Sequence, residues 1–186
     1  MTALPRLDHL LTLEEWDELP EDEYHGAELV DGVVVATPSP TPAHQDAVDE
    51  LKPQLKAAFV SHGLAVVREI DVVLVAGFPP LVRQPDLVVV SRAIRQGNPK
   101  RFMATDVVLA VEIVSPGSRH IDRMHKLGEY AEARIPNYWI VDIEGDPCLQ
   151  AYSLAGDSYD LVGDFTGTAQ LTDPAPATID LAALLG

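Results

Sequence analysis

The sequence predicts an α/β fold of the α+β kind, in which a central mixed β-sheet is flanked by helices and carries an N-terminal hairpin extension. β-branched apolar stretches recur through the chain, two amphipathic helical segments interrupt them, and the run 107–114 is too apolar for an edge strand. Strands interrupted in this way form a sheet with helices packed on it. Because 186 residues is the size of one domain, we expect residues 1–186 to fold as a single unit.

The N-terminal region predicts a short helix followed by a hairpin. Thr12 with Glu15 three residues later is a capping box, which opens a helix over 13–19. Within 24–36, two apolar stretches flank Asp31-Gly32, a pair suited to a type I′ turn. We therefore expect two short antiparallel strands here.

A longer helix is expected next. Thr41 as N-cap and Pro42 at the first helical position begin it, apolar residues at spacings of three and four continue to Phe59, and Gly63 stops it. Pro53 removes a backbone hydrogen bond from the interior of this helix. It predicts a kink, or a helix that begins later than Pro42.

The rest of the chain predicts mainly strands. A further helix, capped by Ser118, precedes the strand that starts at Asn137, and a short apolar helix ends the chain. The expected strands lie over 64–70, 71–76, 85–91, 107–114, 137–143, 149–154 and 159–162.

Charge is distributed unevenly. With 29 Asp and Glu against 13 Lys and Arg, the formal net charge of -16 argues against nonspecific binding of polyanions. Residues 51–134, however, hold twelve basic residues against eight acidic ones. Five of the basic residues gather around Asp86 and form either a solvated loop or a rim that faces phosphates. They are Arg83, Arg92, Arg95, Lys100 and Arg101.

Several classes of protein are excluded. No apolar run approaches the roughly 20 residues of a membrane helix, and residues 1–11 lack a signal-peptide pattern, so we expect a cytoplasmic protein without a membrane partner. The single cysteine, Cys148, excludes an intramolecular disulfide and a cysteine-based zinc site.

Two carboxylates stand in otherwise apolar strands. Glu112 lies within 107–114, where a buried charge needs a partner; the alternative is an exposed strand end paired with Arg119 or Arg123. Asp86 precedes the strand that starts at Leu87, unless it is a simple turn residue at the strand edge. A shared hard cation, Mg²⁺ or Mn²⁺, would account for both carboxylates.

Lys126 is the candidate for positioning a water molecule beside such a cation. It follows Asp122 by four residues, so both lie on one helical face. The alternative is a surface Asp122–Lys126 pair with no role in chemistry.

Four segments in order strongly resemble the Uma2 (Uma-two) family of restriction endonuclease domains in the PD-(D/E)XK nuclease superfamily. They are AELVDGVVV, SPTPAHQ, QPDLVVVS and AVEIVSPGSRHIDRMHKLGEYAEARIPNYWIVD. The resemblance covers about residues 11–142 and leaves 143–186 as C-terminal strands and a short helix. It implies a restriction-endonuclease-like fold with a divalent metal at its centre.

Residue by residue, the resemblance implies that Asp86, Glu112, Glu28 and the backbone carbonyl of Ile113 hold the metal. The superfamily lysine normally lies two residues after the second acid, where this chain has Val114. The chain therefore resembles the variant in which the lysine has moved to the following helix, as Lys126. The predicted catalytic residues are Glu28, Asp86, Glu112 and Lys126, and the predicted substrate-binding residues are His44, Gln45, Arg83, Arg119 and Arg123.

The leading hypothesis is an Mg²⁺- or Mn²⁺-dependent endonuclease that hydrolyses DNA phosphodiester bonds, binds DNA weakly without metal, and forms a homodimer because cutting both strands needs two active sites. A second hypothesis is an inactive nuclease-fold module that binds nucleic acid or a protein, since Val114 replaces the strand lysine. A third is a small phosphoester hydrolase with the same metal site.

Overall fold

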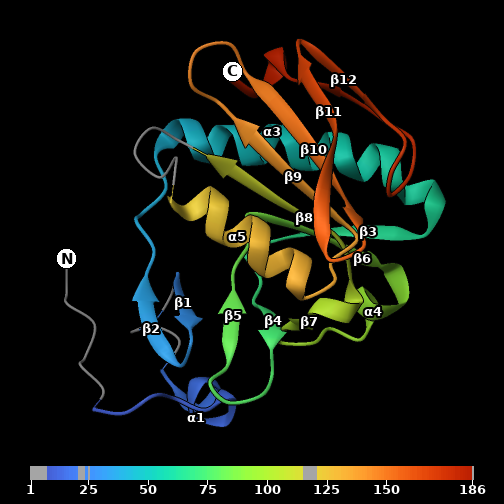
Figure 1. Ribbon diagram of the computed structural model, residues 1–186. Coiled ribbons are helices and arrows are strands. Elements are labelled where there is room, and N and C mark those ends of the chain that lie inside the picture. The colour runs from blue at the N-terminus through green and yellow to red at the C-terminus, as the bar shows by residue number, and fades with distance from the viewer. Residues whose placement is uncertain (1–7, 21–23, 25, 115–120, 186) are drawn as a thin grey trace.

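The computed structural model describes residues 8–20, 24, 26–114 and 121–185, with the side chains of 121–124 left undescribed. A six-stranded sheet forms its centre, and a smaller five-stranded sheet lies beside it at the N-terminal end (Figure 1). The N-terminal helix borders the small sheet, and a C-terminal strand pair borders the large one. The helices are α1 (Leu13–Glu18), α3 (Pro42–Phe59), α4 (Arg92–Gln96) and α5 (Ile121–Glu132).

The six-stranded sheet is mixed, as the sequence predicts. Its order is β11-β10-β9-β8-β6-β3, with β8 and β9 parallel and all other neighbours antiparallel. The strand β8 lies inside the sheet and is buried along nearly its whole length. The strands are β3 (Leu64–Arg68), β6 (Leu87–Ser91), β8 (Val107–Val114), β9 (Asn137–Asp142), β10 (Cys148–Ala155) and β11 (Ser158–Thr166).

Helices cover the two faces of this sheet, and the alternation of side chains along β8 decides which face each residue meets. Leu109 and Val111 belong to the core cluster that includes Leu51 of α3. Ala110 belongs to a second cluster, which includes Tyr130 of α5. Glu112, two residues beyond Ala110, therefore lies on the α5 face.

The five-stranded sheet has the order β2-β1-β5-β4-β7. A third apolar cluster joins it to α1, and only the residues 84–86 connect its strand β5 to β6 of the large sheet. This short connection brings the two sheets together. The strands are β1 (Ala27–Val30), β2 (Val33–Ala36), β4 (Val72–Val75), β5 (Leu81–Arg83) and β7 (Phe102–Met103).

The N-terminal predictions are confirmed. The Thr12–Glu15 capping box is present at α1. The turn of the β1–β2 hairpin has positive φ at both Asp31 (50°) and Gly32 (76°), as a type I′ turn requires.

The expected effect of Pro53 on the start of its helix is wrong. α3 begins at Pro42 and continues through Pro53 to Phe59. A proline inside a helix costs about 3 kcal/mol. Leu51 and Leu55 are fully buried on either side of it, and burying each leucine contributes about 1.5–3 kcal/mol. Tertiary packing therefore outweighs the missing hydrogen bond.

Several short elements were not expected from the sequence. They include β5, β7 and α4, and also a strand pair in the Pro- and Thr-rich stretch near the C-terminus. The expected terminal helix is a 3₁₀ helix, η3 (Ala182–Leu185). No described helix is long and apolar enough to cross a membrane. The strand pair is β12 (Thr168–Leu171) and β13 (Ala177–Asp180), and the other 3₁₀ helices are η1 (Val60–His62) and η2 (Ala104–Asp106).

Candidate functional site

Glu112 is a buried carboxylate in the middle of the sheet. Its side chain faces α5, and the residue is only 8 % exposed. The Lys126 ammonium lies 2.9 Å from its Oε1, and the Tyr130 hydroxyl donates to the same oxygen at 2.8 Å. Lys126 and Tyr130 are four residues apart and so occupy one face of α5. The alternative of an exposed strand end is therefore wrong.

Lys126 joins two carboxylates from different sheets. Its Nζ is also 3.3 Å from Oε1 of Glu28 on β1, and the residue is only 7 % exposed. Lys126 is therefore not a surface residue, because its ammonium is buried between acids, and the side chain of Asp122 lies outside the described residues. α5 thus places the Lys126 ammonium between Glu28 of the small sheet and Glu112 of the large sheet.

Glu28 is held by further donors. Arg83 Nη1 lies 2.6 Å from Glu28 Oε2, and the backbone N–H of Gln84 donates to Oε1 at 3.1 Å. Arg83 is itself buried, and its Nε and Nη2 donate to the two carboxylate oxygens of Glu129, each at 2.7 Å. Since two carboxylates occupy the guanidinium, the contact of Arg83 with substrate suggested by the sequence has no support in this arrangement.

Asp86 lies beside Glu112 at the start of β6. The pairing of Leu87 with Val111 brings Asp86, the residue before Leu87, close to Glu112, the residue after Val111. The backbone N–H of Ile113 donates to Asp86 Oδ2 at 2.6 Å, and His44 Nε2 is 3.1 Å from Oδ1. His44, at the start of α3, therefore contacts Asp86.

Electrostatics differ sharply between the acids. Burial raises the pKa of Glu112 to about 7, and Asp86 and Glu28 add to this rise while Lys126 opposes it. Burial would also raise the pKa of Glu28, but the charges of Lys126 and Arg83 outweigh it and lower that pKa. The charged form of Glu28 is thus favoured, whereas Glu112 can change its protonation near neutral pH.

His44 responds to its acidic neighbour. Its hydrogen bond to Asp86 raises the pKa of the imidazole against the effect of burial, and Glu112 and the backbone of Ile113 act in the same direction. Nδ1 of His44 is buried and has no hydrogen-bond partner among the described residues. The ring is therefore held through Nε2, on the side that faces Asp86.

The donor set fits a hard divalent cation bound by few protein ligands. Within the described residues, no three His, Cys, Asp or Glu side chains form a ready-made metal cage. Mg²⁺, however, is commonly held by one or two carboxylates together with waters and substrate oxygens. Asp86 and Glu112 supply two neighbouring carboxylates, and both donors to Glu112 use Oε1. Oε2 has no donor among the described residues, so it is available to a cation.

The structure places one of the remaining predicted substrate-binding residues, Gln45, outside this cluster. The side chain of Gln45 is exposed. Arg119 and the side chain of Arg123 lie outside the described residues. The sequence analysis missed three site residues, namely Gln84, Glu129 and Tyr130 with its hydroxyl. The spacing of three and four from Lys126 is the signal that could have found Glu129 and Tyr130.

Comparisons with known proteins identify a family and a fold. A model of the Uma2 family, described as "Putative restriction endonuclease", matches residues 13–183, which extends beyond the resemblance read from the motifs. Among solved structures, the chain is similar to "a putative nuclease belonging to DUF820" from Anabaena variabilis ATCC 29413, with TM-score 0.71 and 17 % identity over 94 % of this chain and 97 % of that chain. This similarity establishes the nuclease-type fold. No curated protein matches.

Proposed function

The chain belongs to the Uma2 family of "Putative restriction endonuclease" domains, and we propose that it is a nuclease that uses Mg²⁺ or Mn²⁺ to hydrolyse DNA phosphodiester bonds. The observation that carries the proposal is the position of Lys126. Its ammonium contacts the carboxylate of Glu112 on β8, and Asp86 directly precedes β6, the strand paired with β8. Two carboxylates and a lysine in one place are what metal-assisted phosphodiester hydrolysis needs.

Each residue has a role that its contacts support. Asp86 and Glu112 would hold the cation, together with the backbone carbonyl of Ile113. When bound, the cation would polarise the phosphate and lower the pKa of a water molecule. Lys126, which is hydrogen-bonded to Glu112, would orient the attacking water and offset the negative charge that develops on the phosphate.

Glu28 is better supported as a positioning residue than as a metal ligand. Its two oxygens accept from Arg83, Gln84 and Lys126, and this holds the ammonium at Glu112. Its predicted place among the metal ligands stays a prediction. His44 would orient Asp86 through the contact between Nε2 and Oδ1.

The proposal is tested by incubating plasmid DNA with purified protein in Mg²⁺ or Mn²⁺. We expect nicking that EDTA abolishes, and a loss of about 100-fold or more in Lys126→Met, because a positioned acid–base group contributes about 10²–10⁴-fold. Glu112→Gln and Asp86→Asn should also be inactive, whereas Arg134→Gln, an exposed change far from the site, should cut normally. Nicking that survives both EDTA and Glu112→Gln would overturn the proposal.

Metal binding can be measured without catalysis. A cation that binds only the folded state raises Tm, so Mn²⁺ should stabilise the wild type and not Asp86→Asn. The absence of any Mn²⁺ effect would favour the second candidate, an inactive nuclease-fold module. The observation behind that candidate is Val114, which occupies the usual position of the strand lysine. Hydrolysis of small phosphoesters without nicking of DNA would favour the third candidate, a small phosphoester hydrolase.

A homodimer and a cytoplasmic location also stay predictions. Cutting both strands of a duplex requires two active sites, which a symmetric dimer supplies. A monomer measured by light scattering in the presence of metal and DNA, together with double-strand cleavage, would contradict the homodimer.

A further inference from the structure

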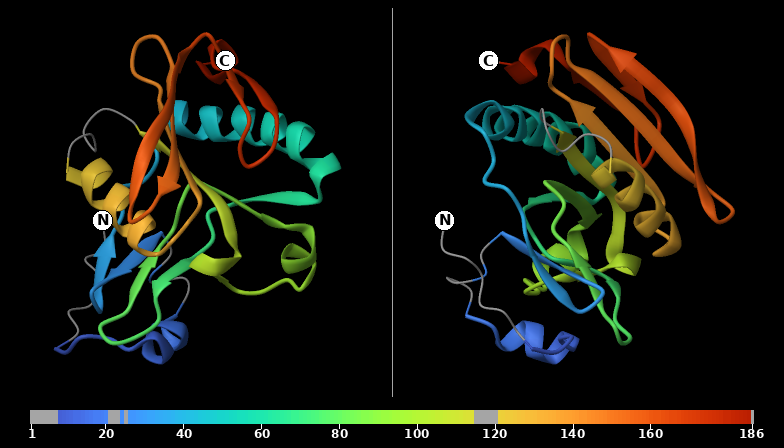
Figure 2. Two further views of the ribbon diagram at one scale, coloured as in Figure 1. Left: turned by 45° about the vertical axis from the view of Figure 1, so that its right-hand side comes forward. Right: turned by 60° about the vertical axis from the view of Figure 1, so that its left-hand side comes forward.

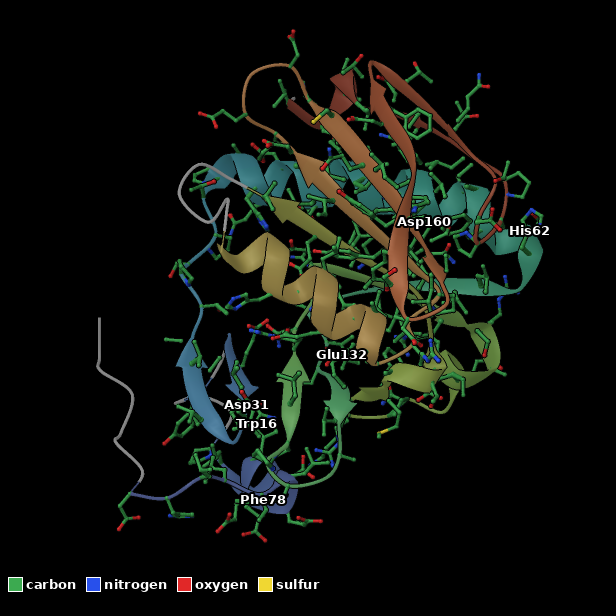
Figure 3. All side chains as sticks on the ribbon, in the orientation of Figure 1. Trp16, Asp31, His62, Phe78, Glu132 and Asp160 are labelled. Atoms are coloured by element: carbon green, nitrogen blue, oxygen red, sulfur yellow. The ribbon has the colours of Figure 1, made fainter. Side chains whose placement is uncertain are left out.

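The basic residues that gather around Asp86 in the sequence are separated in three dimensions. Arg83 is buried against Glu28 and Glu129. Lys100 and Arg101 lie at a hollow beside α1, where Arg101 pairs with Asp17. The Trp16 side chain labelled in Figure 3 lines that hollow, and its Nε1 donates to the part-buried carboxylate of Asp71 there. The predicted rim does not form as one surface.

Arg92 and Arg95, in contrast, join cations from other parts of the chain. They lie on α4 and line a groove of about 400 Å³ together with Lys52 and Lys56 of α3 and Arg68 of β3. α3 lies on one side of β3 and α4 on the other (Figures 1 and 2). Apolar residues of β3, which is the edge strand of the large sheet, form the floor. Five of the chain's thirteen basic residues thus meet in one groove.

We propose that this groove, lined by Lys52, Lys56, Arg68, Arg92 and Arg95, binds the phosphate backbone of the DNA strand that enters the catalytic site. The inference rests on the proposed function, because it takes DNA as the substrate. It places the sequence-independent part of binding outside the carboxylate cluster.

One end of the groove lies near the backbone of Asp86. Arg68, at the end of β3, pairs in register with Leu87, the residue after Asp86. The backbone N–H of Glu69 donates to the carbonyl of Asp86 at 3.3 Å. The opposite end lies near η1, where Figure 3 labels His62. Four residue steps along β3 span about 13 Å, which is the axial rise of roughly four nucleotides in one strand of B-form DNA.

The positive charge of the groove is only partly compensated. Arg68 pairs with Asp49 and Glu69. Burial lowers the pKa of Lys52, and the neighbouring charges of Lys56 and Arg68 lower it further. Cations that repel one another in a protein of net charge -16 indicate a place for an anion.

Protection of an exposed sheet edge does not account for the arrangement. Proteins place charged residues on an edge strand to prevent pairing with other chains. Here only Arg68 lies on β3, and the other four cations come from helices on either side of it. Cations on both walls of a groove match a polyanion that runs along its length.

The test is DNA binding without cleavage. Fluorescence anisotropy of a labelled duplex of about 20 base pairs is measured in Ca²⁺ between about 50 and 200 mM salt. Lys56→Gln/Arg95→Gln removes two exposed cations from the groove, and Lys100→Gln/Arg134→Gln removes two exposed cations elsewhere. The first variant should weaken affinity at least about tenfold and reduce the slope of log K against log salt by about 1–2, while the second changes neither.

The outcomes distinguish this inference from the proposed function. Equal affinity of both variants and wild type would overturn the groove assignment while plasmid nicking still supports a nuclease. Groove-dependent binding without nicking in any metal would overturn the nuclease activity and support the groove. Tighter groove-dependent binding of polyglutamate than of DNA would assign the groove to an acidic protein and overturn the inference. If the Tm of the first variant is well below that of the wild type, the variant Lys52→Gln/Arg95→Gln is used in its place.

Discussion

The ammonium of Lys126 lies 2.9 Å from Oε1 of Glu112. Glu112 belongs to β8, which precedes residues 115–120 in the sequence, and Lys126 belongs to α5, which follows them. The strand position two residues after Glu112 holds Val114. The ammonium that contacts Glu112 is therefore supplied by Lys126 of α5 and not by a residue of the same strand. The same ammonium contacts Glu28, which couples the small sheet to the large one.

Lys126→Met should lower the free energy of unfolding by about 3–5 kcal/mol, because it leaves a buried carboxylate without its cation. The double variant Glu112→Gln/Lys126→Met should recover part of this loss, since the unpaired charge at 112 is then gone. Urea unfolding in EDTA measures both values. A single variant as stable as wild type would contradict the buried pair.

The metal-free protein should become less stable as pH rises from about 4.5 to about 7. Burial raises the pKa of Glu112 to about 7, whereas a glutamate in an unfolded chain titrates near 4.3. In this window the folded protein keeps a proton that the unfolded chain has released, so the free energy of unfolding falls with pH. Glu112→Gln should have a flatter Tm profile in EDTA. Parallel profiles for the two proteins would mean that Glu112 stays ionised throughout.

Arg83→Met should cost about 3–5 kcal/mol, because the buried Glu28 and the part-buried Glu129 both lose their guanidinium partner. Arg101→Met is the matched control. Its pair with Asp17 is partly exposed, so the loss should stay below about 1 kcal/mol. Chemical denaturation of the two variants side by side measures the difference, and equal losses would show that burial adds nothing to the Arg83 network.

Gly32→Ala should destabilise the protein more than Gly63→Ala. Both glycines have positive φ (76° and 71°), where a side chain costs about 1–2 kcal/mol. A Cβ at Gly32 would also lie 3.0 Å from Leu10 Cβ and 3.1 Å from the carbonyl oxygen of Leu11, while Gly63 has open space. Thermal melts should place Gly32→Ala lower, and the reverse order would contradict the close approach at the hairpin.

Elements defined by local pattern were predicted well. The capping box of α1, the Asp31-Gly32 turn and the strand over 107–114 each depend on residues close in sequence. The later helix start predicted from Pro53 is wrong, because buried leucines from the same helix outweigh the local cost of the proline. The short strand β5 was missed because three residues carry too little pattern to identify it.

In the candidate site, too, some features could be predicted from the sequence and others depend on the tertiary structure. An acid in an apolar strand had to acquire a partner, so Glu112, Asp86 and Lys126 could be chosen as candidates from the chain alone. Which partner each acid meets depends on distant elements: His44 contacts Asp86, and Arg83 is enclosed by Glu28 and Glu129. The basic groove likewise forms from α3, β3 and α4, because folding brings together charges that lie far apart along the chain and separates others that lie close.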